Sequence, residues 1–232
     1  TERDLEGYLG KALGAGGDYA DLYFEYTTTS SIMLDESIIK HATEGISVGC
    51  GVRVIVGDQT GYAYTDDLSP DCIRKAANIA THIAHGPSQV HSIGLTASRT
   101  PTNYYPVSLS SSKQELKGKL ELANRANFTA RAHDRRIKQV RVSYSDQERH
   151  ILIAGSDGHL VTDYQPLLRL SVFCIAQSDD GKDRRESGTS GGGGRVGIEF
   201  FGGDKTPEYF ACEAARQAIV QLDANEAPAG EM

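Results

Sequence analysis

The stretch ISVGCGVRVIV, residues 46–56, decides the fold class of this chain, because an apolar side chain recurs at every second position along it. That period predicts a β-strand with one buried face. Gly49 and Gly51 fall on the opposite face, where the missing side chains indicate a bulge or the close approach of another segment. The turn residues 57–59 then predict a further strand over residues 60–65.

The same kinds of pattern continue on both sides of this turn. In the first half we expect an amphipathic helix, two more strands, and a second helix with Ser69 as its N-cap, at residues 2–14, 20–26, 31–40 and 70–84. In the second half we expect a helix with a Ser112–Glu115 capping box, four strands with a turn at Asp157-Gly158, and a last helix from Pro207. The first five of these elements are expected at residues 112–132, 138–145, 150–154, 160–164 and 168–176.

These patterns predict an α+β fold of two consecutive units, each a mostly antiparallel sheet flanked by helices. The periodicity fails between residues 86 and 106, where Ser, Thr, Pro and Gly dominate. Such a composition is typical of a domain boundary. We therefore expect a first domain at residues 1–88, a linker at 89–106 and a second domain at 107–232.

Composition narrows the range of functions. The chain has 232 residues and a net charge of −7, so it lacks the basic surface that nucleic acids require, and no nucleic-acid partner is expected. No apolar run approaches the roughly 18 to 20 residues of a membrane span, and the first residues lack a signal-peptide pattern, so we expect a cytoplasmic protein without a membrane partner. The four cysteines form no C-x-x-C pair and are expected to be small buried apolar residues: Cys50, Cys72, Cys174 and Cys212.

The glycine run inside SGTSGGGGR, residues 187–195, is the strongest candidate site. Consecutive glycines predict a loop whose backbone approaches something closely or moves, and the candidate substrate-contacting residues are Gly191, Gly192, Gly193, Gly194 and Arg195. The alternative is a mobile loop with Arg195 in a surface ion pair to Glu186 or Glu199. The letters also match a dinucleotide fingerprint, a nucleophile elbow and part of a P-loop. The first two need a strand before them and a helix after them, whereas a charged stretch precedes the run and a short strand is expected at residues 198–201. A P-loop needs Lys and then Ser or Thr after its last glycine, where Arg195 and Val196 stand.

No complete catalytic or metal site emerges from local spacing. His82 and His85 lie three residues apart on an expected helix, but no carboxylate or third imidazole accompanies them. The pattern Ser110-x-x-Lys113 lies in a polar loop that enters a helix, where serine caps and lysine is solvated. We therefore expect no catalytic residue and no metal ligand in this chain.

Several blocks of the sequence resemble the TldD/PmbA family of metallopeptidases, whose members are also described as modulators of DNA gyrase. The blocks follow the family order: DYADLYFE at 18–25, GVRV at 51–54, TGYAY at 60–64, RLSV at 169–172, residues 190–201, and APAG at 227–230. The glycine run and the first block are similar to TldD rather than to its paralogue PmbA, also called TldE. In the family a His-Glu-x-x-x-His motif lies shortly beyond the last block, and this chain ends at Met232 before reaching it.

The resemblance implies a function for a longer protein. It implies the first two domains of a zinc-type metallopeptidase that acts on unfolded peptides, with the metal in a third, C-terminal domain that this chain lacks. The two domains would then form a chamber wall, a substrate guide and a dimer surface, with a TldE/PmbA-like paralogue or a second copy as partner. The alternative is a non-catalytic binding or regulatory module. We expect the chain to be a truncated part of the longer protein.

Overall fold

The computed structural model describes residues 1–84, 94–97, 103–180, 183–225 and 230. Helices and strands follow in the order α1 Glu2–Leu13, β1 Tyr19–Asp35, β2 Ile38–Val56, β3 Gln59–Thr65, α2 Pro70–Ile83, β4 Thr96–Ala97, η1 Ser111–Lys113, α3 Leu116–His133, β5 Ile137–Gly155, β6 His159–Gln177, β7 Arg185–Gly194, η2 Ile198–Gly202 and α4 Pro207–Asp223. The strands form one sheet in the order β3-β2-β1-β5-β6-β4, and β7 pairs with β6. The β2–β3 and β6–β7 pairs are antiparallel, while the short β4 pairs in parallel with β6. The predicted α+β class is confirmed.

The strands are longer than the sequence predicts. The expected strands at 20–26 and 31–40 belong to the single strand β1 and the start of β2, joined by a turn at Glu36 and Ser37, whose φ angles are 54° and 61°. The expected breaks inside β5 and β6 are likewise absent. Polar runs such as Thr27–Ser31 hide the period of two, yet Thr and Ser fit a strand whose outer face meets water. The turn at Asp157-Gly158 is confirmed, with Gly158 at a φ of 91°.

The described chain divides into two compact units that interleave along the sequence. Unit 1 contains residues Thr1–Thr28, Ile46–Tyr105 and Arg149–Gln165, and unit 2 contains Thr29–Gly45, Pro106–Glu148 and Pro166–Met232. Each of the long strands β1, β2, β5 and β6 contributes residues to both units, which the expectation of two consecutive units does not anticipate. The boundary at 89–106 stays a prediction, because most of these residues lie outside the described ranges.

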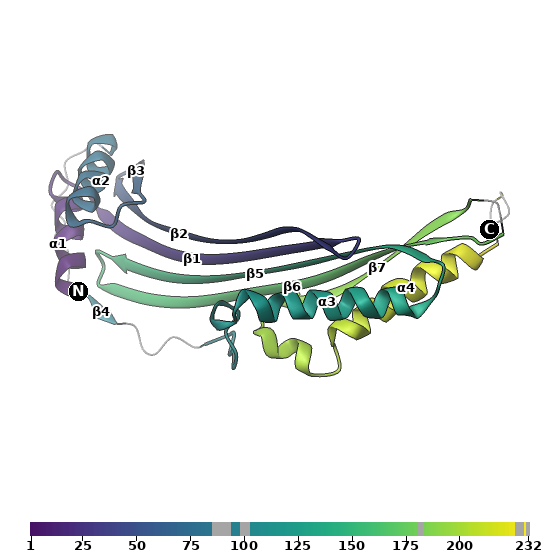
Figure 1. The fold of residues 1–232 in the computed structure, drawn as a ribbon. Coiled ribbons are helices and arrows are strands. Elements are labelled where there is room, and N and C mark those ends of the chain that lie inside the picture. The colour runs from purple at the N-terminus through teal and green to yellow at the C-terminus, as the bar shows by residue number, and fades with distance from the viewer. Residues whose placement is uncertain (85–93, 98–102, 181–182, 226–229, 231–232) are drawn as a thin grey trace. The chain divides into compact units, whose positions relative to one another are not determined.

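Unit 1 packs α1 and α2 against its part of the sheet (Figure 1). Its core contains Leu9, Leu22, Val52 and Val54, each at most 1% exposed. The Thr81 hydroxyl on α2 donates to the Ala12 carbonyl on α1 at 2.7 Å and so ties the two helices together. Tyr62 covers Gly51, because a Cβ built there would lie 2.7 Å from the Tyr62 hydroxyl oxygen. This is the close approach that the glycine predicts.

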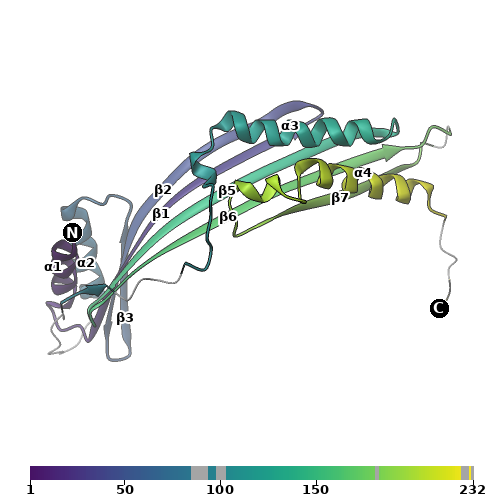
Figure 2. The ribbon, with the colours of Figure 1, turned by 90° about the horizontal axis from the view of Figure 1, so that it is seen from below.

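Unit 2 packs α3 and α4 along one face of β5, β6 and β7 (Figure 2). On α4, Ala211, Ala215 and Leu222 are buried, while Ile219 is partly buried. Alternate residues of β5 and β6 face these helices, as the period of two predicts. None of the helices in the described part of the chain is long and apolar enough to cross a membrane.

Candidate functional site

The glycine run is part of a strand, which corrects the expectation of a loop. β7 pairs with β6 over ten consecutive positions, from Gln177 opposite Arg185 to Leu168 opposite Gly194. The expected strand after it is instead the 3-10 helix η2, in which Phe201 is buried. Glu199 on η2 accepts the backbone N–H groups of Ser108 and Leu109 at 2.9 and 3.1 Å, and these bonds hold η2 against the segment that precedes η1.

Two glycines of β7 give α4 room to pack. A Cβ at Gly188 would lie 2.1 Å from the Ala214 carbonyl oxygen, and one at Gly192 would lie 2.3 Å from the Phe210 ring. Real Cβ atoms do not come this close to backbone or ring atoms, so any other residue would push α4 away from the strand. These glycines therefore have a structural role inside unit 2.

The other glycines of the run have φ angles or close neighbours that a residue with a side chain would not tolerate. Gly193 and Gly194 have φ angles of 144° and 151°, values that L-residues rarely adopt. A Cβ at Gly193 would lie 1.9 Å from the Leu168 carbonyl oxygen, and one at Gly191 would lie 2.5 Å from that of Leu170. Only Gly194 has open space around its missing Cβ. Gly191, Gly193 and the following Arg195 are exposed.

An open hollow of about 470 Å³ crosses unit 2 at the end of this run. Its lining comes from four neighbouring strands: Thr29, Ser30, Ser31, Ser145, Asp146, Gln147, Leu167, Leu168, Arg169, Gly193 and Gly194. No residue of α3 or α4 lines it, which places it on the sheet face that these helices leave uncovered. Thr29, Ser145 and Arg169 are exposed there. The structure thus places two of the five predicted site residues, Gly193 and Gly194, at this hollow. We call it the unit 2 hollow.

The helix-covered face beneath carries buried charges that the sequence analysis did not single out. Glu148 accepts the Ser110, Ser111 and Ser112 hydroxyls at 2.7, 3.1 and 2.6 Å, together with the Ser112 backbone N–H at 2.9 Å. Burial alone would raise the pKa of Glu148, but these donors outweigh it and lower the pKa to about 2. The predicted Ser112–Glu115 capping box is therefore wrong. Ser112, in η1, instead donates to Glu148 on β5, and the N-cap of α3 is Glu115.

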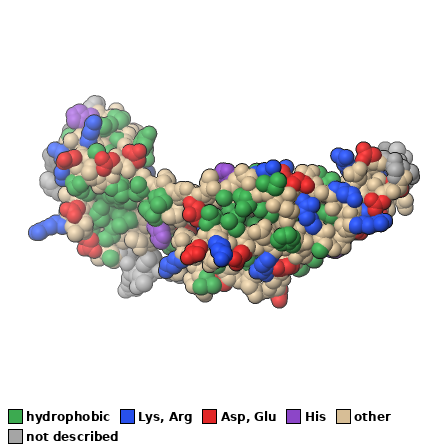
Figure 3. All heavy atoms as spheres, in the orientation of Figure 1, with side chains coloured by type: hydrophobic (Ala, Val, Ile, Leu, Met, Phe, Trp, Pro, Cys, Tyr) green, Lys and Arg blue, Asp and Glu red, His purple; other side chains and the backbone are tan. Residues whose placement is uncertain are grey.

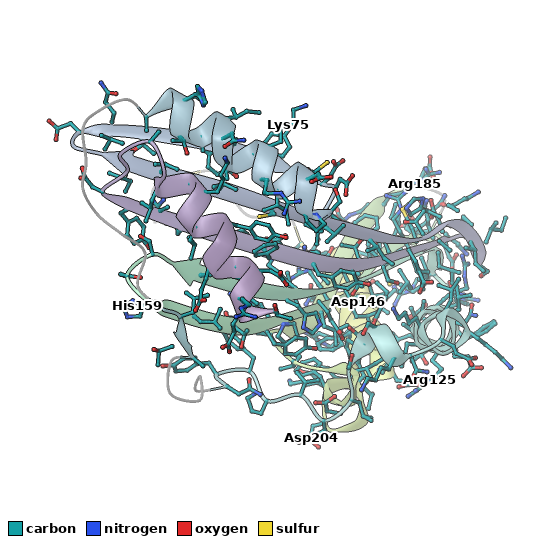
Figure 4. All side chains as sticks on the ribbon, turned by 90° about the vertical axis from the view of Figure 1, so that its left-hand side faces the viewer. Lys75, Arg125, Asp146, His159, Arg185 and Asp204 are labelled. Carbon is teal, nitrogen blue, oxygen red and sulfur yellow. The ribbon has the colours of Figure 1, made fainter. Side chains whose placement is uncertain are left out.

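A second buried charge pair lies next to this cluster. The Lys119 ammonium on α3 lies 2.9 Å from the Asp146 carboxylate on β5, and both side chains are only 2% exposed (Figure 4 labels Asp146). The Glu44 carboxylate lies 3.8 Å from the same ammonium. These pairs join α3 to β5 and β2, so the sheet that carries the unit 2 hollow is fixed from behind.

Nothing in the described part of the chain assembles a metal site. No group of three or more His, Cys, Asp or Glu residues lies close enough together there to hold an ion. The His82 ring nitrogen Nδ1 lies 2.7 Å from the Asn78 carbonyl oxygen, and His85 lies outside the described residues. Cys50 and Cys174 are buried, and burial raises the pKa of each thiol to about 12. The expectation of four buried cysteines is wrong for Cys72, which is partly exposed, and for Cys212, which is exposed.

The fold and both halves of the chain match one family of metallopeptidases. The family model described as PmbA/TldA metallopeptidase domain 1 matches residues 20–84, and the model of the PmbA/TldA metallopeptidase central domain matches residues 110–222. The chain belongs to this PmbA/TldD family.

Two relatives agree with this assignment. The chain is 37% identical over 226 residues to a metalloprotease TldD homolog of Haemophilus influenzae, covering 93% of this chain and 45% of the relative. A TldD homolog of Buchnera aphidicola from Acyrthosiphon pisum is 35% identical over 222 residues, covering 92% and 44%. The chain thus spans less than half the length of these relatives.

The fold is shared with a proposed modulator of a DNA gyrase from Thermotoga maritima, at a TM-score of 0.76 and 21% identity, over 99% of this chain and 50% of that one. TldE from Thermococcus kodakarensis matches at a TM-score of 0.69 and 14% identity, over 93% and 47%.

Proposed function

We propose that this chain supplies the first two domains of a TldD-type metallopeptidase and guides extended, unfolded peptides along unit 2. The observation that carries the proposal is the unit 2 hollow, where Gly193 and Gly194 present bare backbone beside polar side chains of three other strands. Family membership supports a peptide substrate, because the relatives are described as metalloproteases. A groove without side chains on one wall suits a ligand recognised through its backbone.

The edge of the sheet gives this guide a mechanism. In the described part of unit 2, β7 pairs with β6 and with no other strand, so one edge of β7 faces away from the sheet. The Gln217 side chain accepts the Thr189 N–H at 3.4 Å, and the exposed Gly191 and Gly193 follow beyond it. An extended peptide can add a strand to such an edge through main-chain hydrogen bonds. Arg195 follows the strand, and its planar guanidinium suits a peptide carboxylate.

The chemistry of peptide cleavage belongs to parts of the protein outside this chain. The donor sets of the described residues do not fit a metal ion, so we assign no catalytic step to them. A zinc-type ion in a third domain, a dimer with a TldE-like paralogue or a second copy, and a cytoplasmic location are part of the same proposal. In it the residues described here bind and orient the substrate only.

Filling the unit 2 hollow tests the proposal. Ser145 lines the hollow, while Ser143 is exposed two positions earlier on the same strand and does not line it. Ser145→Trp should weaken binding of an unfolded, fluorescently labelled peptide by at least about tenfold, or roughly 1.4 kcal/mol, and Ser143→Trp should leave it unchanged. Equal affinities for the wild type and both variants would contradict a substrate role for the hollow.

A further inference from the structure

A separate apolar groove lies in unit 1. It encloses about 510 Å³, a volume within the range of small-ligand sites, and its lining includes Phe24, Tyr26, Leu68, His150, Leu152 and Tyr164. Phe24 and Leu152 also pack against the core of unit 1, so the floor of the groove is anchored. The His150 ring lies against the Tyr164 ring, with centroids 4.9 Å apart, and forms an aromatic wall.

The groove leaves large apolar side chains in contact with water. Tyr26 is 42% exposed and Leu68 is 39% exposed. In Figure 3, hydrophobic side chains gather over unit 1, and acidic side chains lie among and beside them. Exposed apolar surface that is rimmed by polar groups is typical of an interaction site. Covering these side chains would be favourable at about 25 cal/mol per Å² of apolar area.

Charge identifies the kind of partner. Among the residues that the structure describes, the lining holds two carboxylates, Glu25 and Asp163, and neither lysine nor arginine. Glu25 already has Arg149 at 3.5 Å, whereas no ion pair involving Asp163 is found among the described residues. Asp163 instead accepts the Tyr164 backbone N–H and the Gln165 amide. The whole chain carries a charge of −7, which disfavours a second copy or an anionic lipid surface at this groove.

We infer that the unit 1 groove binds a segment of an extended polypeptide in which an aromatic or large aliphatic side chain stands next to a lysine or arginine. The apolar side chain enters between Tyr26, Leu68 and the His150–Tyr164 wall, and the basic group faces Asp163. This inference rests on the proposed peptide-guiding function. It adds a preference for particular side chains, which the unit 2 hollow does not provide because it is proposed to contact the peptide backbone. A chain with the groove would prefer basic, apolar segments of unfolded substrates.

Four labelled octapeptides test the inference by fluorescence anisotropy with the full 232-residue chain. Their central pair is Phe-Lys, Phe-Glu, Ala-Lys or Ala-Glu within a Gly-Ser background. The Phe-Lys peptide should bind at least about tenfold more tightly than the other three. Asp163→Lys should reverse the preference between Phe-Lys and Phe-Glu. Tyr26→Ser and Leu68→Ser should each weaken Phe-Lys binding about fivefold or more.

Tyr64→Ser is the matched control, because Tyr64 is 77% exposed on β3 and does not line the groove. Equal affinities for the four peptides would overturn the inference, as would a Tyr26→Ser variant that binds like the wild type. Sedimentation in which the wild type forms a dimer that Tyr26→Ser dissociates would assign the groove to a second copy, and binding of phosphatidylglycerol vesicles would assign it to a membrane; both would overturn it. The Ser145→Trp variant, tested with the same peptides, separates failure of the unit 2 hollow from failure of this groove.

Discussion

The Glu148 carboxylate on β5 accepts both the hydroxyl and the backbone N–H of Ser112, at 2.6 and 2.9 Å. With Ser110 and Ser111 these bonds surround a buried carboxylate with donors. They also hold the 3-10 turn η1, and through it the start of α3, on the sheet. The contact thus fixes the helix layer of unit 2, behind the face that carries the unit 2 hollow.

This contact predicts a specific pH dependence of stability. The pKa of Glu148 is about 2 in the folded chain against an ordinary value of 4.5, so its stabilising effect is present above pH 4.5 and is lost as the pH falls toward 2. Glu148→Gln should destabilise the chain at pH 7 by about 1.5–3 kcal/mol, because a charged acceptor is lost. In thermal unfolding from pH 2 to 7, the difference in melting temperature between the wild type and Glu148→Gln should shrink below pH 4.5. A difference in melting temperature that stays constant across this range would contradict the lowered pKa of Glu148.

The Lys119–Asp146 pair predicts strong coupling between the two residues. Lys119→Met leaves the Asp146 carboxylate buried without its partner and should cost about 3–5 kcal/mol of unfolding free energy. The double variant Lys119→Met/Asp146→Leu should recover most of this loss, because neither charge then stays buried. Arg125→Met serves as the control, since Arg125 pairs with Glu208 while half exposed, and should cost about 0–1 kcal/mol. Additive losses in urea titrations of the double variant would count against the coupling.

Replacing glycine by alanine should have opposite effects on stability at Gly188 on β7 and at Gly7 on α1. Gly188→Ala would bring a Cβ to 2.1 Å from the Ala214 carbonyl oxygen and should destabilise unit 2 by about 1–3 kcal/mol. Gly7→Ala lies on α1 with nothing within 4 Å of the new Cβ and should stabilise the chain by up to about 1 kcal/mol. Denaturant midpoints measure both. If Gly188→Ala left the denaturant midpoint unchanged, α4 would not pack against β7 at Gly188.

Arg195 offers a test of peptide anchoring at the end of β7. Arg195→Ala should weaken binding of an unfolded peptide with a free carboxyl terminus by about tenfold. The affinity of Arg195→Lys should lie between those of Arg195→Ala and the wild type, because an ammonium cannot bind a carboxylate in a bidentate way. An amidated peptide is the control and should bind all three proteins equally. If the amidated and free peptides lose affinity alike, Arg195 does not contact a carboxylate.

Much of the fold could be predicted from side-chain period. The alternation at residues 46–56, the N-cap Ser69 and the helix start at Pro207 correspond to β2, α2 and α4. Strand lengths could not be predicted, because the polar residues of Thr27–Ser31 face water on one side and carry no hydrophobic signal. The interleaving of the two units follows from these strand lengths, because each long strand contributes residues to both units.

The candidate site was less accessible from the sequence. The glycine run indicated close approach correctly, but the approaching groups include α4 and β6, which only the tertiary structure reveals. The buried charges had a usable signal: the inward pattern of Val140, Val142 and Tyr144 continues to Asp146 and Glu148, which places both carboxylates on the buried face. The sequence carried no such signal for the unit 2 hollow, because the residues of its four strands are brought together only by the register of the sheet.

Amide hydrogen exchange of the chain, with and without a saturating unfolded peptide, shows whether an extended peptide binds along β7. Peptide that adds a strand to β7 should slow exchange within residues 187–194, while exchange in α3, on the opposite face of the sheet, should stay unchanged. Protection confined to β7 and the unit 2 hollow is the predicted result. Bound peptide with unchanged exchange throughout residues 187–194 would contradict the proposed guide.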